Sequence, residues 1–283
     1  AVPFEFVPNE MVHTFFLWRC ADIAAKTAAV LGRAADAPCY DALARKTKNA
    51  FHRRFYSEEE GYGKHGGNVF ALEMGVPEKQ YKNVVNALRE ELSGRQGHLF
   101  TGIFGTQFLF EVLADHGLQH LACDALRKRT FPSYGFWLED GATTTREQWD
   151  NSNSHNHPMF GGGLAWFYRK LAGMQADPQT PGYRHIIFRP QPVDALDWVR
   201  YKTGTVYGEA GIHWRQRSDA FLADILVPVG CTATVYIPPA DATRVRESGM
   251  AAHNAPGLSY IGSRDGHAVY SVAGGRYSFF ADL

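Results

Sequence analysis

One stretch in the middle of the chain decides the fold and the chemistry, and it runs Trp137-Leu138-Glu139-Asp140-Gly141-Ala142-Thr143-Thr144-Thr145-Arg146-Glu147-Gln148-Trp149-Asp150-Asn151. It continues through Ser152-Asn153-Ser154-His155-Asn156-His157-Pro158-Met159-Phe160. Four carboxylates, two Trp and two His fall within these 24 residues, and the apolar positions follow neither a helical nor a strand period. Rings beside carboxylates suit a sugar, because pyranose C–H faces stack on rings and an acid can move a proton at the glycosidic bond. We therefore interpret this segment as half of a glycoside hydrolase active site.

Glu147 is the predicted catalytic residue of this segment. It lies between a Thr triplet and Trp149, and Thr hydroxyls with nearby backbone N–H groups can hold a carboxylate in one rotamer. The alternative is an ion pair between Glu147 and Arg146 or another surface Arg. Glu139 and Asp140 are lesser candidates, since Asp followed by Gly is explained by a turn.

Three rings are candidates for contact with substrate. Trp137 and Tyr134 are candidates for stacking on a sugar, and Trp149 is expected to line the pocket that holds Glu147. Burial in the core is the alternative for Trp137 and Tyr134.

Three polar side chains complete the predicted substrate-binding set. His157 is expected to form a hydrogen bond with a sugar hydroxyl, and a His satisfied by backbone carbonyls is the alternative. His98 belongs to a second aromatic, Gly-rich loop over residues 95–106 and is placed at the pocket rim. Asp150 is either a helix cap or a sugar ligand.

No metal or other cofactor is expected. His155 and His157 alternate, but no third ligand stands at a suitable spacing, and the four Cys form no CxxC pair. Buried thiols are the expected state of the Cys residues, with a Cys20–Cys39 disulfide between two neighbouring helices as the alternative.

Composition excludes several classes of partner. The chain has 283 residues with 29 basic and 29 acidic side chains, so no basic excess favours nucleic acid or an anionic membrane. No run of 18 apolar residues predicts a membrane span. Ala1-Val2-Pro3-Phe4 lacks the basic and apolar regions of an uncleaved signal peptide, so the chain is either mature or cut from something longer.

The chain changes character near a linker at Asp177–Gly182. We expect a helical domain over 1–176 and an antiparallel β-sandwich over 182–283, in an α+β multidomain arrangement. The expected helices start at Asn9 as an N-cap and at Asp36, then cover Asn68–Met74, a segment from Pro77 to Gly94, Gln107–Asp115, Leu118–Lys128 and a segment through Leu164–Leu171. Helical spacing predicts one apolar stripe on the first helix, made of Val12, Phe15, Phe16, Cys20, Ile23, Ala24, Val30 and Leu31. In the segment from Pro77 to Gly94 it predicts that Val84, Val85, Leu88 and Leu92 face inward. The expected strands are His185–Arg189, Trp198–Thr203, Gly204–Ala210, Gly211–Arg217, Phe221–Val227, Thr232–Ile237, Ala268–Val272 and Arg276–Ala281.

The segment Gly141-Ala142-Thr143-Thr144-x-x-Glu147-x-Trp149-Asp150 resembles a signature of the glycoside hydrolase family 78 α-L-rhamnosidases. Further pieces fit that family in the same order along nearly the whole chain: Gly97-His98-Leu99-x-Thr101-Gly102-x-x-Gly105-Thr106, Asn156-His157 before Phe160-Gly161, Trp166-Phe167-Tyr168-x-x-Leu171-Ala172-Gly173 and Phe188-Arg189-Pro190. The position of Arg146 is often aromatic in that family, so the pocket wall is expected to differ here.

The resemblance implies an (α/α)₆ barrel, an inverting mechanism, Glu147 as general base and His157 as a contact to the rhamnose ring. It also implies that the general acid lies upstream of this chain, which holds about seven of the twelve helices of a full barrel. The expected partners are a rhamnose-containing glycoside, oligosaccharide or polysaccharide and the upstream half of the barrel, and the expected compartment is periplasmic or secreted, with cytoplasmic as the alternative. The functional alternatives are a non-catalytic carbohydrate-binding or structural piece and a different glycosidase on an (α/α)₆ scaffold.

Overall fold

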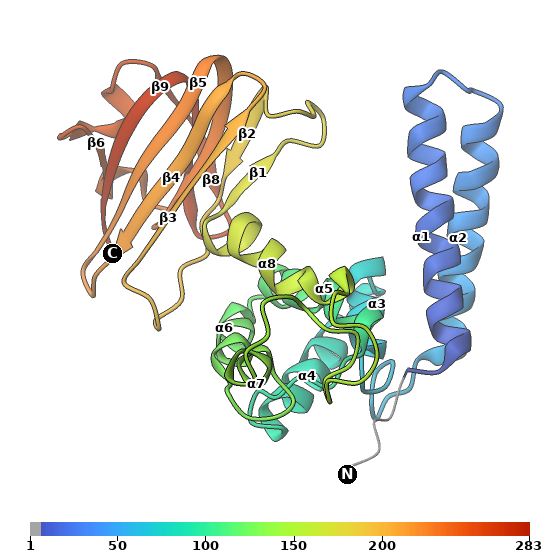
Figure 1. The fold of residues 1–283 in the computed structure, drawn as a ribbon. Helices are drawn as coiled ribbons and strands as arrows, with labels where there is room; N and C mark the ends of the chain where they lie inside the picture. Colours follow the sequence, from blue (N-terminus) through green and yellow to red (C-terminus); the bar gives the residue numbers. More distant parts are fainter. Residues whose placement is uncertain (1–6) are drawn as a thin grey trace. The chain divides into compact units, whose positions relative to one another are not determined.

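The computed structural model describes residues 7–283, so the Ala1–Phe4 stretch lies outside the described residues. The chain forms two compact units, which divide between Gly163 and Leu164 (Figure 1). The predicted boundary lay later, near residues 177–181. The segment just after the division belongs with the second unit because Trp214 Nε1 donates to the Leu171 carbonyl at 2.8 Å.

The first unit is helical, as predicted (Figure 1). None of the helices within residues 7–283 has the length and apolar content that a membrane span requires. The helices of this unit are α1 (Asn9–Val30), α2 (Asp36–Phe55), α3 (Gly67–Met74), α4 (Glu78–Gly94), α5 (Ile103–Asp115), α6 (Gln119–Arg127), α7 (Tyr134–Glu139) and the 3₁₀ turn η1 (Pro158–Gly161). The short helix α8 (Gly162–Trp166) follows and contains the division between the two units.

Helices α1 and α2 form an antiparallel hairpin that is anchored at one end. Phe15 of α1 is fully buried and stacks on Phe70 of α3, with ring centroids 4.5 Å apart. The expected cap at Asn9 is wrong: Pro8 precedes the first helical residue and no side chain caps the helix, because Asn9 already has helical geometry.

The other end of this hairpin is exposed. The predicted inward stripe included Val30 and Leu31, which are 87% and 69% exposed, and Ile23, which is 52% exposed. That part of the prediction is wrong for this structure, because no other element of the first unit, within residues 7–163, covers these side chains. Cys20 and Cys39 are exposed thiols without a disulfide, so the expectation of burial holds only for the two other Cys.

The remaining helices follow the predicted pattern more closely. The inward residues of α4 are the predicted ones, Val84, Val85, Leu88 and Leu92. Helix α5 begins four residues earlier than expected, and α7 was not predicted; Ser133 caps it by accepting a hydrogen bond from Phe136 N at 3.0 Å.

Gly162 lets the backbone of η1 and α8 approach α5, since a Cβ there would lie 2.4 Å from the Thr106 carbonyl oxygen.

The second unit is a single hydrogen-bonded sheet that bends into two layers (Figure 1). A short π-helical turn, η2 (Phe167–Leu171), leads into it, and the 3₁₀ turns η3 (Ala242–Arg244) and η4 (Ala252–Asn254) interrupt it. Its strands are β1 (Met174–Ala176), β2 (His185–Phe188), β3 (Trp198–Thr205), β4 (Gly208–Gln216), β5 (Ala220–Ile237), β6 (Val245–Glu247), β7 (Met250–Ala251), β8 (Leu258–Arg264) and β9 (His267–Asp282).

Two long strands connect the layers. β5 and β9 pair along both of their halves, and the register shifts between Val227 and Thr232. Each was predicted as two strands, because Pro228 and Gly230 in β5 and a Gly pair in β9 resemble turns; the structure bends the strands there without ending them. The pairs are antiparallel except that β2 runs parallel to β5.

Candidate active site

The segment after α7 folds into two limbs that face each other. The Glu147 N–H donates to the Ser154 carbonyl at 2.8 Å, and the His157 N–H donates to the Thr145 carbonyl at 2.9 Å. The Thr145 hydroxyl donates a hydrogen bond to the His157 carbonyl at 2.7 Å, and the Thr144 hydroxyl donates one to the His155 carbonyl. These bonds fix the positions of Glu147 and His157 although the segment has no regular secondary structure.

The Glu147 carboxylate is half-buried and accepts a hydrogen bond from the backbone N–H of Ser154 at 3.1 Å. The prediction assigned this role to Thr hydroxyls as well. The structure corrects that part, because the hydroxyls of Thr144 and Thr145 donate to carbonyls of the opposite limb instead.

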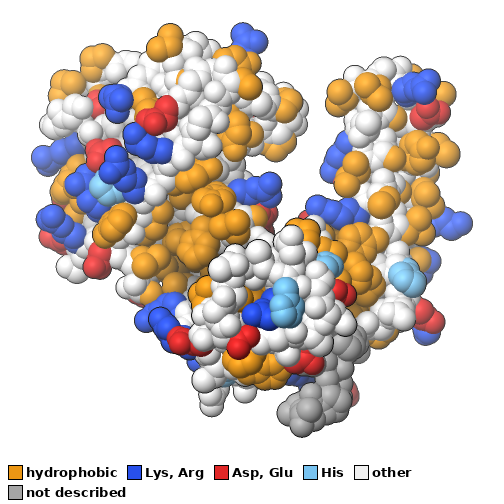
Figure 2. Space-filling model, in the orientation of Figure 1, with side chains coloured by type: hydrophobic (Ala, Val, Ile, Leu, Met, Phe, Trp, Pro, Cys, Tyr) orange, Lys and Arg blue, Asp and Glu red, His pale blue; other side chains and the backbone are white. Residues whose placement is uncertain are grey.

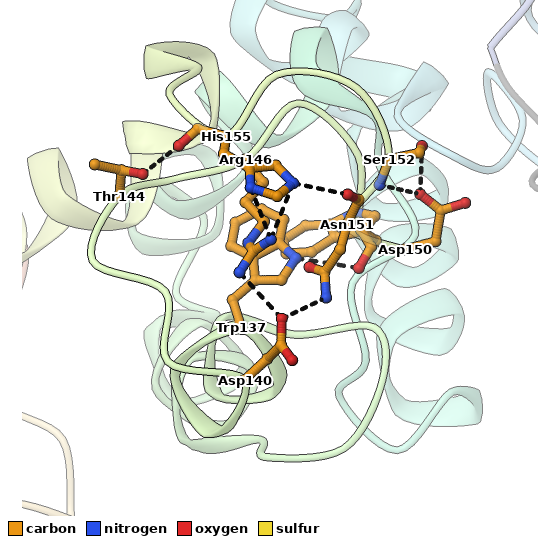
Figure 3. A network of polar contacts seen from close by, with 9 residues as sticks. Trp137, Asp140, Thr144, Arg146, Asp150, Asn151, Ser152 and His155 are labelled. Atoms are coloured by element: carbon orange, nitrogen blue, oxygen red, sulfur yellow. Dashed lines mark hydrogen bonds and ion pairs between the residues drawn. The ribbon is translucent and has the colours of Figure 1, made fainter.

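Arg146 is the centre of a polar network beneath the loop (Figure 3). Its side chain is buried, and Nη2 lies 3.1 Å from Asp140 Oδ2. Nη1 lies 3.1 Å from His155 Nε2, and the Asn151 amide donates to the same Asp140 oxygen at 3.0 Å. The alternative pairing of Arg146 with Glu147 is therefore not the one the structure forms.

The predicted stacking rings lie under the loop as a packed cluster. Trp137 and Trp149 are each 2% exposed and stack with centroids 4.5 Å apart, and Phe160 packs on Trp149 at 4.4 Å. Trp137 Nε1 donates to the Trp149 carbonyl, and Trp149 Nε1 donates to the Thr101 carbonyl, both at 3.1 Å. The structure favours the packing alternative for Trp137 and packs Trp149 beside it, and the second bond joins the loop to the 95–106 segment.

Tyr134 belongs to the same cluster. Its ring lies edge-on to Trp149 at 5.4 Å, and its hydroxyl donates to the Phe160 carbonyl. Burial raises the pKa of Tyr134 well above its ordinary value, so the hydroxyl stays protonated as a donor. Its position too favours packing over stacking on a sugar.

His98 joins the 95–106 segment to the residues that precede α7. Nδ1 lies 2.9 Å from the Arg95 carbonyl oxygen and Nε2 lies 2.8 Å from the Thr130 hydroxyl, so both ring nitrogens have partners. A place for His98 at the pocket rim stays a prediction, and any contact with substrate would require it to leave one of these bonds.

His157 differs from His98 in this respect. Its Nδ1 is buried without a hydrogen-bond partner among residues 7–283, and the same holds for Arg146 Nε and Asn151 Oδ1. Buried polar atoms are ordinarily paired, so three unpaired ones in one loop indicate a place where a polar ligand or water belongs.

The other carboxylates of the segment are engaged. Asp150 is exposed and forms a turn by accepting bonds from the Ser152 hydroxyl at 2.6 Å and backbone N–H at 3.1 Å, and these bonds lower its pKa. It caps no helix, which removes one of its two predicted roles. Glu139 pairs with Arg129 at the surface. Within residues 7–283, no three His, Cys, Asp or Glu side chains come together as metal ligands.

Sequence reasoning missed Asn151 and Ser154 and the partner of Arg146. Asp140 and Arg146 are six residues apart, a spacing that is informative only once the chain turns back at Gly141, whose φ is +77°.

Two family models match the chain. Residues 3–171 match the bacterial alpha-L-rhamnosidase 6 hairpin glycosidase domain, and residues 173–252 match the bacterial alpha-L-rhamnosidase C-terminal domain. The chain belongs to the bacterial α-L-rhamnosidase family. This finding confirms the predicted resemblance and the predicted α+β fold class.

Relatives and solved structures agree with this family. The chain is 31% identical to an α-L-rhamnosidase of Streptomyces avermitilis over 289 residues, which is 96% of this chain and 27% of that protein. The crystal structure titled as the Streptomyces avermitilis enzyme complexed with L-rhamnose matches with a TM-score of 0.86 at 30% identity, over 97% of this chain and 27% of that one. The Dictyoglumus thermophilum α-L-rhamnosidase matches with a TM-score of 0.85 at 33% identity, over 95% and 31%. The chain thus spans about 27% to 31% of these proteins.

Proposed function

We propose that this chain is part of an enzyme that hydrolyses terminal α-L-rhamnosides with inversion, and that Glu147 is its general base. The observation that carries the proposal is the Glu147 carboxylate, which is half-buried, held by the Ser154 N–H at 3.1 Å and paired with no cation among residues 7–283. The names of the relatives supply the substrate class.

Such a carboxylate suits a base that activates water. One oxygen can stay on the Ser154 N–H while the other accepts a proton from the water that attacks the anomeric carbon. The loop leaves this carboxylate without a charged partner among residues 7–283, because Arg146 pairs with Asp140 instead.

His157 is the second residue proposed to act on substrate. The His157 N–H donates to the Thr145 carbonyl, and the His157 carbonyl accepts from the Thr145 hydroxyl, so the backbone of His157 is fixed. Its Nδ1 has no hydrogen-bond partner among the described residues. A rhamnose hydroxyl would supply the missing partner.

The general acid is proposed to come from an upstream segment of the longer enzyme. Asp140 is held by Arg146 and Asn151, and Glu139 is held by Arg129, so neither is poised to protonate a leaving oxygen. An inverting pair needs carboxyl groups roughly 6.5–9.5 Å apart. The same upstream segment is proposed to cover the exposed end of α1 and α2, where apolar side chains border a hollow of about 400 Å³.

Hydrolysis of p-nitrophenyl α-L-rhamnopyranoside tests this proposal, with this chain measured beside a chain extended upstream. Turnover by the extended chain alone, with β-rhamnose as the first product, is expected. Turnover by the 283-residue chain would place the acid within it, and no turnover by either would contradict the proposed activity.

A further inference from the structure

The second unit carries a basic groove with an exposed Trp on the outer face of its sheet. Side chains alternate along β3, and the outward ones are Trp198, Arg200 and Lys202. Trp198 is 60% exposed, which is unusual for so large an apolar surface and costs solvation free energy unless something covers it.

The pairing register continues this face across four strands. Arg200 lies opposite His213 of β4, His213 lies opposite Asp224 of β5, and Asp224 lies opposite Ser278 of β9. In the next row Lys202 lies opposite Gly211, and both residues line a hollow of about 400 Å³ together with Arg276. A second hollow of about 690 Å³ adjoins it and shares Arg200 and His213.

The groove is positively charged. Five cations and two carboxylates line the two hollows, and Figure 2 shows Lys and Arg side chains gathered around a His on this unit. The cations are Arg200, Lys202, Arg215, Arg217 and Arg276, and the carboxylates are Asp197 and Asp224.

Two of the five cations are engaged in ion pairs: Arg215 lies 2.8 Å from Asp224, and Lys202 lies 2.7 Å from Glu209 beside the groove. The other three, Arg200, Arg217 and Arg276, have no ion pair among residues 7–283, and Arg200 and Arg276 both line the hollow beside Lys202. A guanidinium binds a carboxylate through two parallel N–H donors, so each can take one acid group.

Asp224 and His213 offer hydrogen bonds that match sugar hydroxyls. Asp224 is fixed by Arg215 and by the Ser278 hydroxyl at 2.9 Å, so it accepts hydrogen bonds from a set position. Burial and the nearby Arg215 lower the pKa of His213, which leaves its ring neutral and able to both donate and accept at neutral pH. The Trp198 ring lies perpendicular to the His213 ring with centroids 6.1 Å apart, and Trp198 is 60% exposed.

We infer that this groove binds a saccharide chain bearing carboxylate groups, with Trp198 stacking on a sugar ring and Arg200 and Arg276 pairing with the acid groups. The choice of a saccharide over other polyanions rests on the proposed rhamnosidase function. The anionic character rests on the charges of the groove alone.

Calorimetric titration of the 283-residue chain with trigalacturonic acid, and with its methyl ester as a neutral match, tests the inference. We expect the acid to bind about tenfold or more tighter than the ester at low salt and to lose that advantage between about 50 and about 500 mM salt. Trp198→Ala is expected to weaken both ligands about tenfold, whereas Arg200→Gln with Arg276→Gln is expected to weaken only the acid.

The exposed Arg264 on β8 gives a matched control, since Arg264→Gln should change neither affinity. Equal binding of acid and ester, no binding of either, or tighter binding of a single-stranded oligonucleotide would overturn the inference. So would loss of binding when the chain is extended upstream, because the face would then be covered by protein. Trp198→Ala should leave rhamnoside turnover by the extended chain within about twofold, so a failure of the proposed function shows in the wild-type turnover and a failure of the groove shows only in the titration.

Discussion

Glu147 and Ser154 are joined twice: the Glu147 N–H donates to the Ser154 carbonyl at 2.8 Å, and the Glu147 carboxylate accepts from the Ser154 N–H at 3.1 Å. The side chain is therefore held by the same partner as its own backbone. A carboxylate held this way keeps its orientation without a cation.

Thr145→Val is expected to loosen His157. The variant keeps the shape of the side chain but removes the hydroxyl that donates to the His157 carbonyl at 2.7 Å, so the free energy of unfolding of the first unit should fall by about 1 kcal/mol. Thr143→Val, at an exposed position two residues earlier, is the control and should change it by less than about 0.5 kcal/mol. Urea unfolding measures both, and equal effects would show that the hydroxyl bond contributes nothing.

Arg146→Gln is expected to cost about 1–2 kcal/mol of stability, because it breaks the contacts to Asp140 and His155 and leaves a smaller group in a buried space. The figure stays modest because the Asp140 side chain is 55% exposed and water can replace the pair. Arg129→Gln breaks the exposed pair with Glu139 and should be nearly neutral. Chemical denaturation of the two variants side by side gives the comparison, and a larger loss for Arg129→Gln would contradict this account.

Trp149→Ala is expected to cost about 3–5 kcal/mol, since it removes a ring from the centre of the aromatic cluster together with the bond to the Thr101 carbonyl. Trp198→Ala removes an equally large side chain that is 60% exposed and should cost less than about 0.5 kcal/mol. Thermal unfolding distinguishes them. Similar losses would mean that the cluster under the loop is not a core.

Glu91 makes the stability of the first unit depend on pH. Burial raises its pKa above the ordinary 4.5, against the lowering effects of the His65 N–H and nearby cations. Because the folded state binds the proton more tightly, the stabilisation is fully present below pH 4.5 and is lost as pH rises through the folded-state pKa.

In the wild type the His65 N–H donates to a Glu91 carboxylate oxygen at 2.7 Å. Glu91→Gln keeps an oxygen that can accept this bond, but the amide cannot ionise. Its stability relative to the wild type should therefore increase as pH rises from 4.5 toward neutrality. Unfolding free energies measured across this interval check the trend, and a difference that shrinks with pH would refute it.

The parts of the fold that could be predicted are those with local signals. Helix α4 was predicted with its correct inward face because Val84, Val85, Leu88 and Leu92 repeat at helical spacing between a Pro and a Gly. Helix α7 was missed because its six residues are too few to show a period, and the bent strands β5 and β9 were split because Pro and Gly at a bulge resemble a turn.

The site was predictable in composition but not in its connections. The segment around Glu147 was identified from its acids and rings, yet the sequence could not show that Asp140 lies against Arg146 or that Ser154 holds Glu147. Those contacts depend on where the chain turns back, at Gly141 and at the positive-φ residues Asn151 and Asn153. The same turn-back explains why both Trp side chains are packed beneath the loop.

The most direct measurement is the kcat of Glu147→Gln on p-nitrophenyl α-L-rhamnopyranoside, in the chain extended upstream. Gln keeps an oxygen for the Ser154 N–H, so the loop should stay folded while the base is lost. The proposal predicts a fall in kcat of about 10²- to 10⁴-fold, with Glu139→Gln as a control that stays within about twofold. A Glu147→Gln enzyme that retained most of its wild-type kcat would contradict the assignment of Glu147 as the base.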